Sequence, residues 1–80
     1  MKIFSLTLAI GSDKYKSTGS TALRCLEKLK EPKNYNSYGV ITLTHNGSES
    51  FVKLVPTNLK RLLAKSVDKA LLAKRLVNLL

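Results

Sequence analysis

The sequence is poor in the residues that build disulfide and metal sites. Its 80 residues include one cysteine, Cys25, one histidine, His45, and no tryptophan. A single cysteine excludes an intrachain disulfide framework, and Cys25 and His45 together supply too few ligands for a zinc site of cysteines and histidines. We therefore expect no metal and no other cofactor. A lone thiol also favours a reducing, intracellular (cytoplasmic) setting.

Acidic residues and long apolar runs are also scarce. Five Asp and Glu stand against fourteen Lys and Arg, so the formal net charge is +9. No apolar run approaches the ~20 residues that cross a bilayer. The start of the chain has the outline of a signal peptide, but Ser5 and Thr7 interrupt its apolar run with the period of a half-buried strand. We expect neither a membrane span nor a signal peptide.

The apolar residues that are present suffice for one small core. They make up 44% of the chain, which is too much for a disordered basic tail. A domain of this length buries only about 60–65% of the surface of its unfolded chain, so its stability alone should be marginal. We expect one domain over residues 1–80.

The N-terminal third of the chain predicts a hairpin followed by a helix. Residues 3–10 alternate apolar and polar side chains, and Gly11-Ser12-Asp13 supplies turn chemistry directly after them. Lys14 to Thr18 then forms a short return strand, and the first helix starts within two residues of Ser20 and ends before Pro32.

One long helix from Ser12 to Lys30 is the alternative for this region. It would leave three strands and the order βαββα. The stretch Thr18-Gly19-Ser20-Thr21 argues against it, because glycine and capping residues weaken the interior of a helix.

A second hairpin is predicted by Asn46-Gly47, the strongest short hairpin signal, because both central residues of its turn need positive φ. The flanking strands cover residues 39–45 and 49–55. A two-residue loop places Ile41 opposite Val52 and Leu43 opposite Ser50. Pro56 ends the strand, and a long helix is expected from Leu59 towards Leu80 after a cap at Thr57 or Asn58.

The two halves of the chain echo each other at an offset of 36 residues, where Gly11-Ser12-Asp13 matches Gly47-Ser48-Glu49. The echo predicts two strand–strand–helix units, residues 1–31 and 38–80, joined by the loop 32–37. At this offset the first strands are out of phase, so a duplication needs a one-residue slip, for example a bulge, in one hairpin.

These elements predict an α+β fold with the order ββαββα: a four-stranded, mostly antiparallel sheet with two helices on one face. A single helical layer leaves the other face of the sheet open as a contact surface. We expect that open face to carry Ser5, Thr7, Val40, Thr42, Phe51 and Lys53.

The C-terminal helix carries more apolar residues than one packed face needs. At 100° per residue, the core side is expected to hold Leu59, Leu62, Leu63, Val67, Ala70, Ala73, Val77 and Leu80. Leu72, Leu76 and Leu79 lie apart from that side, and with Phe51 they are the candidates for an interface with a partner or a second copy. The alternative is that the last two turns pack further into the domain.

Catalysis finds little support in the sequence. His45 lies beside a turn, where a surface role is more common than that of a general base. Cys25 falls within a helical pattern of leucines, where free cysteine usually acts as a small buried apolar residue. The five carboxylates are scattered. We expect a protein that is not an enzyme, with no catalytic residues and no small-molecule substrate.

Nucleic acid is the leading partner class, because a net charge of +9 attracts polyanions and lysines interleaved with tyrosines can place cations on phosphates and rings on bases. The function expected is RNA or DNA backbone binding, or a place in an RNA–protein particle. The candidate residues are Arg24, Lys28, Lys30, Lys33, Tyr35, Tyr38, Lys60, Arg61, Lys65 and Lys69.

The alternative function is that of a structural or accessory subunit in a larger assembly or homo-oligomer, such as a small viral or phage protein, whose cations contact an acidic protein surface. The position of the charges distinguishes the two. Cations that gather on one face beside Tyr35 or Tyr38 favour nucleic acid, whereas an even ring of cations with a leucine patch favours assembly.

Overall fold

This computed structural model describes residues 3–80. They contain four strands and three helices. Their order along the chain is β1 (Phe4–Ile10), β2 (Asp13–Gly19), α1 (Ala22–Lys28), β3 (Gly39–His45), β4 (Ser48–Leu54), α2 (Pro56–Ala64) and α3 (Ser66–Asn78).

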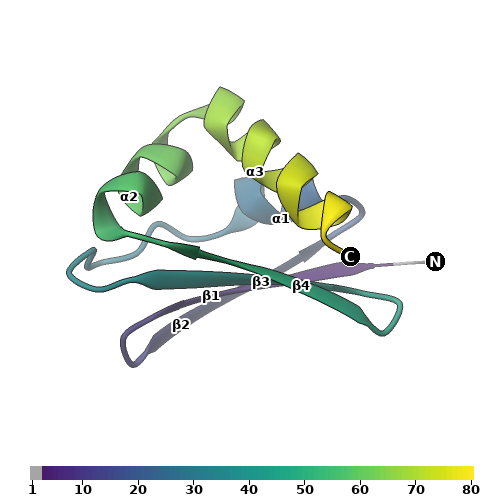
Figure 1. The fold of residues 1–80 in the computed structure, drawn as a ribbon, viewed down its shortest axis with the longest axis horizontal. Helices are drawn as coiled ribbons and strands as arrows, with labels where there is room; N and C mark the ends of the chain where they lie inside the picture. Colours follow the sequence, from purple (N-terminus) through teal and green to yellow (C-terminus); the bar gives the residue numbers. More distant parts are fainter. Residues whose placement is uncertain (1–2) are drawn as a thin grey trace.

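The strands form one antiparallel sheet in the order β2-β1-β3-β4. Figure 1 shows the helices on one side of this sheet and the other side open. The α+β fold and the order ββαββα are therefore confirmed, with the last helix divided in two. The strand β2 and the start of α1 at Ala22 also exclude the alternative of one long helix from Ser12.

Both hairpins close through two-residue loops. Gly11 has φ +58°, as the first central residue of a type II′ turn requires, and Asn46 and Gly47 have φ 53° and 81°, as both central residues of a type I′ turn require. The expected register of the second hairpin is confirmed, since Ile41 pairs with Val52 and Leu43 with Ser50.

The core lies between the sheet and the helices. The strands contribute Leu6, Leu8, Ile10, Ile41, Leu43, Val52 and Leu54, and the helices contribute Ala22, Cys25, Leu26, Leu59, Leu72, Ala73 and Leu76. The strand residues are alternate positions, so period-two patterning decides which face of the sheet is buried.

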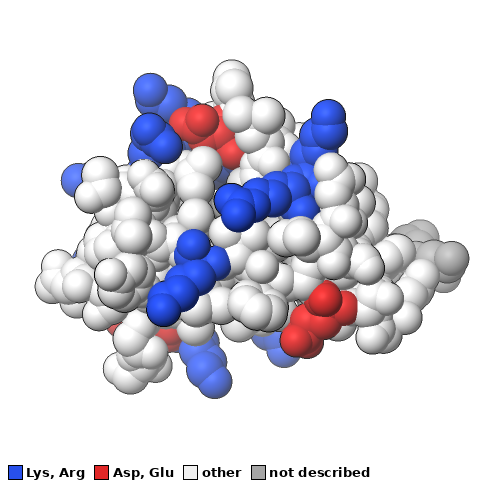
Figure 2. Space-filling model, in the orientation of Figure 1, with Lys and Arg blue, Asp and Glu red and all other residues white. Residues whose placement is uncertain are grey.

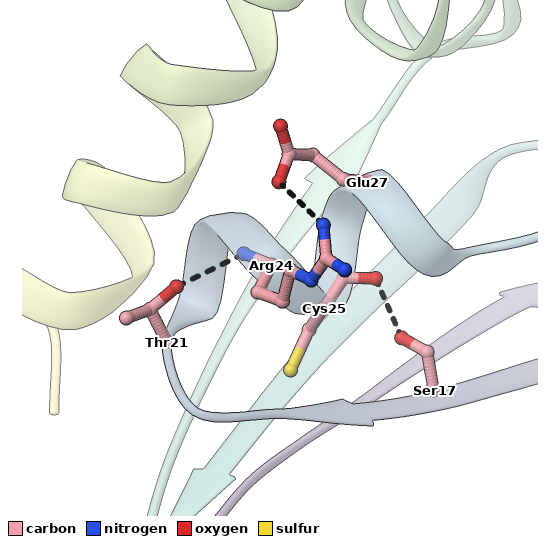
Figure 3. Close-up of polar contacts among 5 residues, drawn as sticks. All are labelled: Ser17, Thr21, Arg24, Cys25 and Glu27. Carbon is pink, nitrogen blue, oxygen red and sulfur yellow. Dashed lines mark hydrogen bonds and ion pairs between the residues drawn. The ribbon is translucent and has the colours of Figure 1, made fainter.

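The helix α1 is held by two side-chain hydrogen bonds and is shorter than predicted. Thr21 Oγ1 accepts a hydrogen bond from the Arg24 amide at 3.1 Å, and the Ser17 hydroxyl of β2 donates to the Cys25 carbonyl at 2.7 Å (Figure 3). The helix ends at Lys28 because Leu29 is extended, with φ −66° and ψ 132°.

The prediction of one continuous C-terminal helix is wrong. Pro56 occupies the first turn of α2, where its missing N–H costs nothing. The chain then becomes extended at Lys65, with φ −116° and ψ 133°, before α3 starts. Asp68 in the first turn of α3 favours this new start, because a carboxylate stabilises the positive end of a helix.

The break at Lys65 also changes which side of the helix is buried. Side-chain directions counted at 100° per residue from Leu59 no longer apply beyond Lys65. Val67, Val77 and Leu80 are therefore exposed, although one continuous helix would have buried them. Leu72 and Leu76 are 4% and 0% exposed. The interface prediction is therefore wrong for these two leucines, which belong to the core as the alternative held.

The strands of the two halves correspond at an offset of 35 residues, not 36. At this offset β1 matches β3 and β2 matches β4 over their full lengths. Leu6 then matches Ile41 in phase, and the slip or bulge that the offset of 36 required is not needed. Thr7 pairs with its own counterpart, Thr42, at the centre of the sheet. The division into two units remains a prediction.

Candidate nucleic-acid interface

A hollow of about 480 Å³ lies where β2, the end of α1 and the following loop meet. Five lysines and one tyrosine line it: Lys14, Tyr15, Lys16, Lys28, Lys30 and Lys33. No carboxylate is among these lining residues. Cations from two stretches that are apart in the sequence, residues 14–16 and 28–33, therefore converge on one place, where an anion is attracted by all of them.

Tyr15 ties the segments of this lysine hollow together. It lies on the helix side of the edge strand β2 and packs, partly buried, against the core. Its hydroxyl oxygen accepts a hydrogen bond from the Lys33 amide at 3.3 Å. The loop after α1 is thereby fixed to β2, which holds Lys33 beside the edge strand from which Lys14 and Lys16 project.

The open face of the sheet forms three rows of side chains across the four strands. In strand order β2-β1-β3-β4, the rows are Lys14-Ala9-Val40-Lys53, Lys16-Thr7-Thr42-Phe51 and Thr18-Ser5-Thr44-Glu49. The central strands thus present only small or β-branched side chains. Cations occupy both edges of the first row, and Glu49 is the one carboxylate in the three rows.

Two exposed aromatic rings lie at the β3–β4 side of this open face. Phe51 is 65% exposed, and Tyr38, just before β3, is 56% exposed. The Lys53 ammonium lies 4.9 Å from the centre of the Tyr38 ring, within cation–π range. An aromatic surface and a cation are therefore next to each other on a face that no helix covers.

The other predicted binding residues are dispersed. Arg24 pairs with Glu27 at 3.8 Å (Figure 3), so part of its charge is compensated. Lys60 and Arg61 lie on α2, Lys65 between the helices and Lys69 on α3. Figure 2 views the molecule from the side, with the helices above the sheet, and shows cationic side chains at several separate places, some of them beside carboxylates.

Tyr35 is less accessible to a base than Tyr38. It is partly buried and packs against the core. Burial raises the pKa of its hydroxyl, and the Glu31 carboxylate and Tyr15 add to this rise. Of the two tyrosines predicted as binding residues, Tyr38 is the more exposed, at 56%.

Cys25 lies in the core, and His45 packs against an aromatic ring. The Cys25 thiol is fully buried and donates to the Phe4 carbonyl at 3.4 Å. Burial raises its pKa, an effect that the Lys28 charge partly offsets, so the thiol stays neutral and unreactive near neutral pH. The His45 ring stacks on Phe4, with centroids 3.8 Å apart. Residues 3–80 contain no cluster of three or more potential metal ligands.

Sequence patterns did not identify Lys14, Tyr15 and Lys16 as site residues. The available signal was the alternation Lys14-Tyr15-Lys16 in a return strand, which puts two cations on one face and a ring on the other. Of the interface candidates, Leu79 and Phe51 are exposed at 54% and 65%, whereas Leu72 and Leu76 are buried.

The chain matches no protein-family model, no curated protein and no solved structure in our comparisons. Among residues 3–80, every helix is too short or too polar to pass through a bilayer. The lysine hollow and the open face are therefore the features of the molecule that point to a function.

Proposed function

We propose that this protein binds the phosphate backbone of nucleic acid. The observation that carries the proposal is the lysine hollow, where five lysines from β2, α1 and the following loop line one cavity together with Tyr15. Phosphodiesters are the anions that a polymer presents in series, so a strand that passes the hollow can bring more than one phosphate within reach of these ammonium groups.

The lysines of the hollow are exposed and long, which suits contact with a flexible polyanion. Each ammonium carries three donors on a mobile stem, and such groups bind phosphate as point charges without reading the base. Affinity should therefore vary little with sequence and fall steeply with salt, by about 0.7–0.9 log units per log unit of salt for each phosphate neutralised.

Two matched triple variants test whether the hollow itself binds. Lys28→Gln, Lys30→Gln and Lys33→Gln together remove three charges from the hollow. Lys60→Gln, Arg61→Gln and Lys65→Gln remove the same number from α2 and the junction after it. Binding of labelled RNA and DNA oligonucleotides is measured by fluorescence anisotropy over a salt series. Thermal melts confirm that both variants fold.

The hollow variant should lose most of the affinity and show a shallower salt slope, equally for all sequences. The α2 variant should lose less, because its charges act only through the overall field. Equal losses in the two variants would show that net charge, and not the hollow, governs binding. A wild-type protein that binds neither RNA nor DNA at low salt would contradict the proposal.

Assembly with other protein chains is the second candidate, and one observation favours it. Val67 and Leu71 on α3 are 71% and 61% exposed, on the side of the helix that faces away from the core. Adjacent exposed apolar side chains are typical of contact surfaces. Sedimentation equilibrium of the wild type and of the Leu71→Gln variant tests this, because assembly through α3 predicts a larger species that the variant loses.

A further inference from the structure

We propose that the open face of the sheet stacks the bases of a single strand, with Phe51 as the main platform and Tyr38 beside it. This inference depends on the proposed function, because it assigns to the bases a surface that continues from the lysine hollow. The ligand expected on this face is single-stranded nucleic acid, and duplexes are expected to bind to the face poorly.

Phe51 has the position that a stacking platform needs. It is 65% exposed in a strand whose inward residues Val52 and Leu54 are buried, so the backbone beneath it is fixed by the core. The neighbours in its row are Thr42 and Thr7, which are too small to cover an aromatic ring. Base–aromatic stacking is tolerant of sequence, since every base has a π-face.

Tyr38 and Lys53 extend this platform. Lys53 is two residues from Phe51 on the same face of β4, a rise of about 6.8 Å. Its ammonium lies 4.9 Å from the centre of the Tyr38 ring. A cation between two accessible rings is placed for a phosphate that links two stacked bases.

Charge selects nucleic acid over a second copy of the chain as the occupant of this face. Lys14, Lys16 and Lys53 stand against Glu49 alone in the three rows, so two open faces brought together would oppose like charges. A polyanion is complementary instead. The aromatic rings then contact the bases and the lysines contact the phosphates.

The open face is also continuous with the lysine hollow. Lys14 and Lys16 project from the edge strand β2 and line the hollow as well. Three strand spacings of about 4.8 Å separate β2 from β4, which is roughly 14 Å. A strand held at the hollow therefore reaches Phe51 within a few nucleotides. A duplex cannot use this platform, because its base faces are already stacked inside the helix.

A tryptophan reporter tests the stacking directly, because the protein contains no tryptophan of its own. Phe51→Trp places the reporter on the open face. Val77→Trp places the control at an exposed site, 43%, on α3. Each variant is titrated with a single-stranded oligonucleotide, with the matching duplex and with inorganic polyphosphate, which offers phosphates without bases. Anisotropy of labelled ligands reports binding in parallel.

The expected result is quenching and a shift of the Phe51→Trp emission by the single strand only, while polyphosphate binds without changing it and the Val77→Trp emission stays unaffected. Phe51→Leu keeps an apolar side chain without a ring, and it should weaken single-strand binding about tenfold, the scale of one lost base stack, and leave duplex binding unchanged.

Two outcomes would overturn the inference, and they are distinguishable. If oligonucleotides bind but the Phe51→Trp emission does not respond and Phe51→Leu retains full affinity, the open face does not stack bases and the proposed phosphate binding stands. If no oligonucleotide binds to the wild type, the proposed function fails and the inference fails with it.

Discussion

The two edges of the sheet differ in how completely the helices cover them. On β4, the inward residues Ser50, Val52 and Leu54 are all buried beneath the helical layer. On β2, the corresponding inward residues Tyr15, Ser17 and Gly19 are only partly buried. The short α1 covers β2 incompletely, and the lysine hollow occupies the space that remains beside it.

This difference separates stability from binding within one small fold. The β4 side is bonded through Ser50 to the carbonyl of Leu76 on α3, whose side chain is fully buried, and its variants should therefore affect the free energy of unfolding most. The β2 side combines partly buried polar groups with a cluster of like charges, which is a poor source of stability and a good anion-binding surface. Three pairs of variants and one pH experiment test this division.

The largest effect is expected for Leu76→Ala on α3, whose side chain is fully buried. Removing it should lower the free energy of unfolding by about 2–5 kcal/mol, a large part of the total for so small a domain. Leu29→Ala, at a partly buried position after α1, should cost clearly less. Urea denaturation of both variants measures the difference, and equal losses would contradict the division.

A second pair adds one methyl group on each side. In Gly39→Ala, the new Cβ would lie 2.6 Å from Cδ2 of the buried Leu59, so α2 or the side chain must shift at a cost of about 1–3 kcal/mol. In Gly19→Ala, the closest atoms are those of the Arg24 side chain at 3.2 Å, so little displacement is needed. Thermal melts should show a lower midpoint for Gly39→Ala. If the midpoint of Gly19→Ala were the lower of the two, the expected difference between the two sides of the sheet would be contradicted.

A serine hydroxyl on each edge strand bonds to a helix carbonyl, and these two bonds form the third pair. Ser50 donates to the buried Leu76 carbonyl at 2.7 Å, and Ser17 donates to the part-buried Cys25 carbonyl at 2.7 Å. Ser50→Ala should cost about 1 kcal/mol, whereas water can replace much of the bond lost in Ser17→Ala. Chemical denaturation of both variants under one condition decides the order.

The smallest effect is a pH dependence on the β2 side. Burial raises the pKa of Cys25 in the folded protein, so the unfolded chain loses its thiol proton first as the pH rises. Stability should be level below the pKa of a free thiol, about 8.5, and should fall above it. Urea midpoints from neutral to mildly alkaline pH should decline for the wild type and decline less for Cys25→Ala. Parallel declines would exclude Cys25 as the cause.

The sequence predicts the hairpins well because their signals are local. Asn46-Gly47 determines a turn by its own backbone preference, and the alternation in each strand then sets the register and the buried face. The break at Lys65 could not be predicted in the same way. Nothing in that residue prevents a helix, and the new phase of α3 depends on how its leucines fit the sheet.

The lysine hollow was predicted only in part for a similar reason. Lys28, Lys30 and Lys33 are close in the sequence and their charge marks them as candidates. Lys14 and Lys16 join them only because β2 lies at the edge of the sheet beside α1. That proximity is a property of tertiary structure, and no pattern within one segment contains it.

The pairing of Thr7 with Thr42 has a consequence for the rate of folding. Each hairpin joins neighbouring residues and can form alone within microseconds, but the seam between β1 and β3 joins residues that are 29 to 39 positions apart. The chain must close this long loop before the seam contributes any free energy. The docking of two preformed hairpins should therefore limit the rate of folding. Substitutions along the seam should slow this step, whereas substitutions at Asn46-Gly47 should mainly change the fraction of chains in which the second hairpin is already formed.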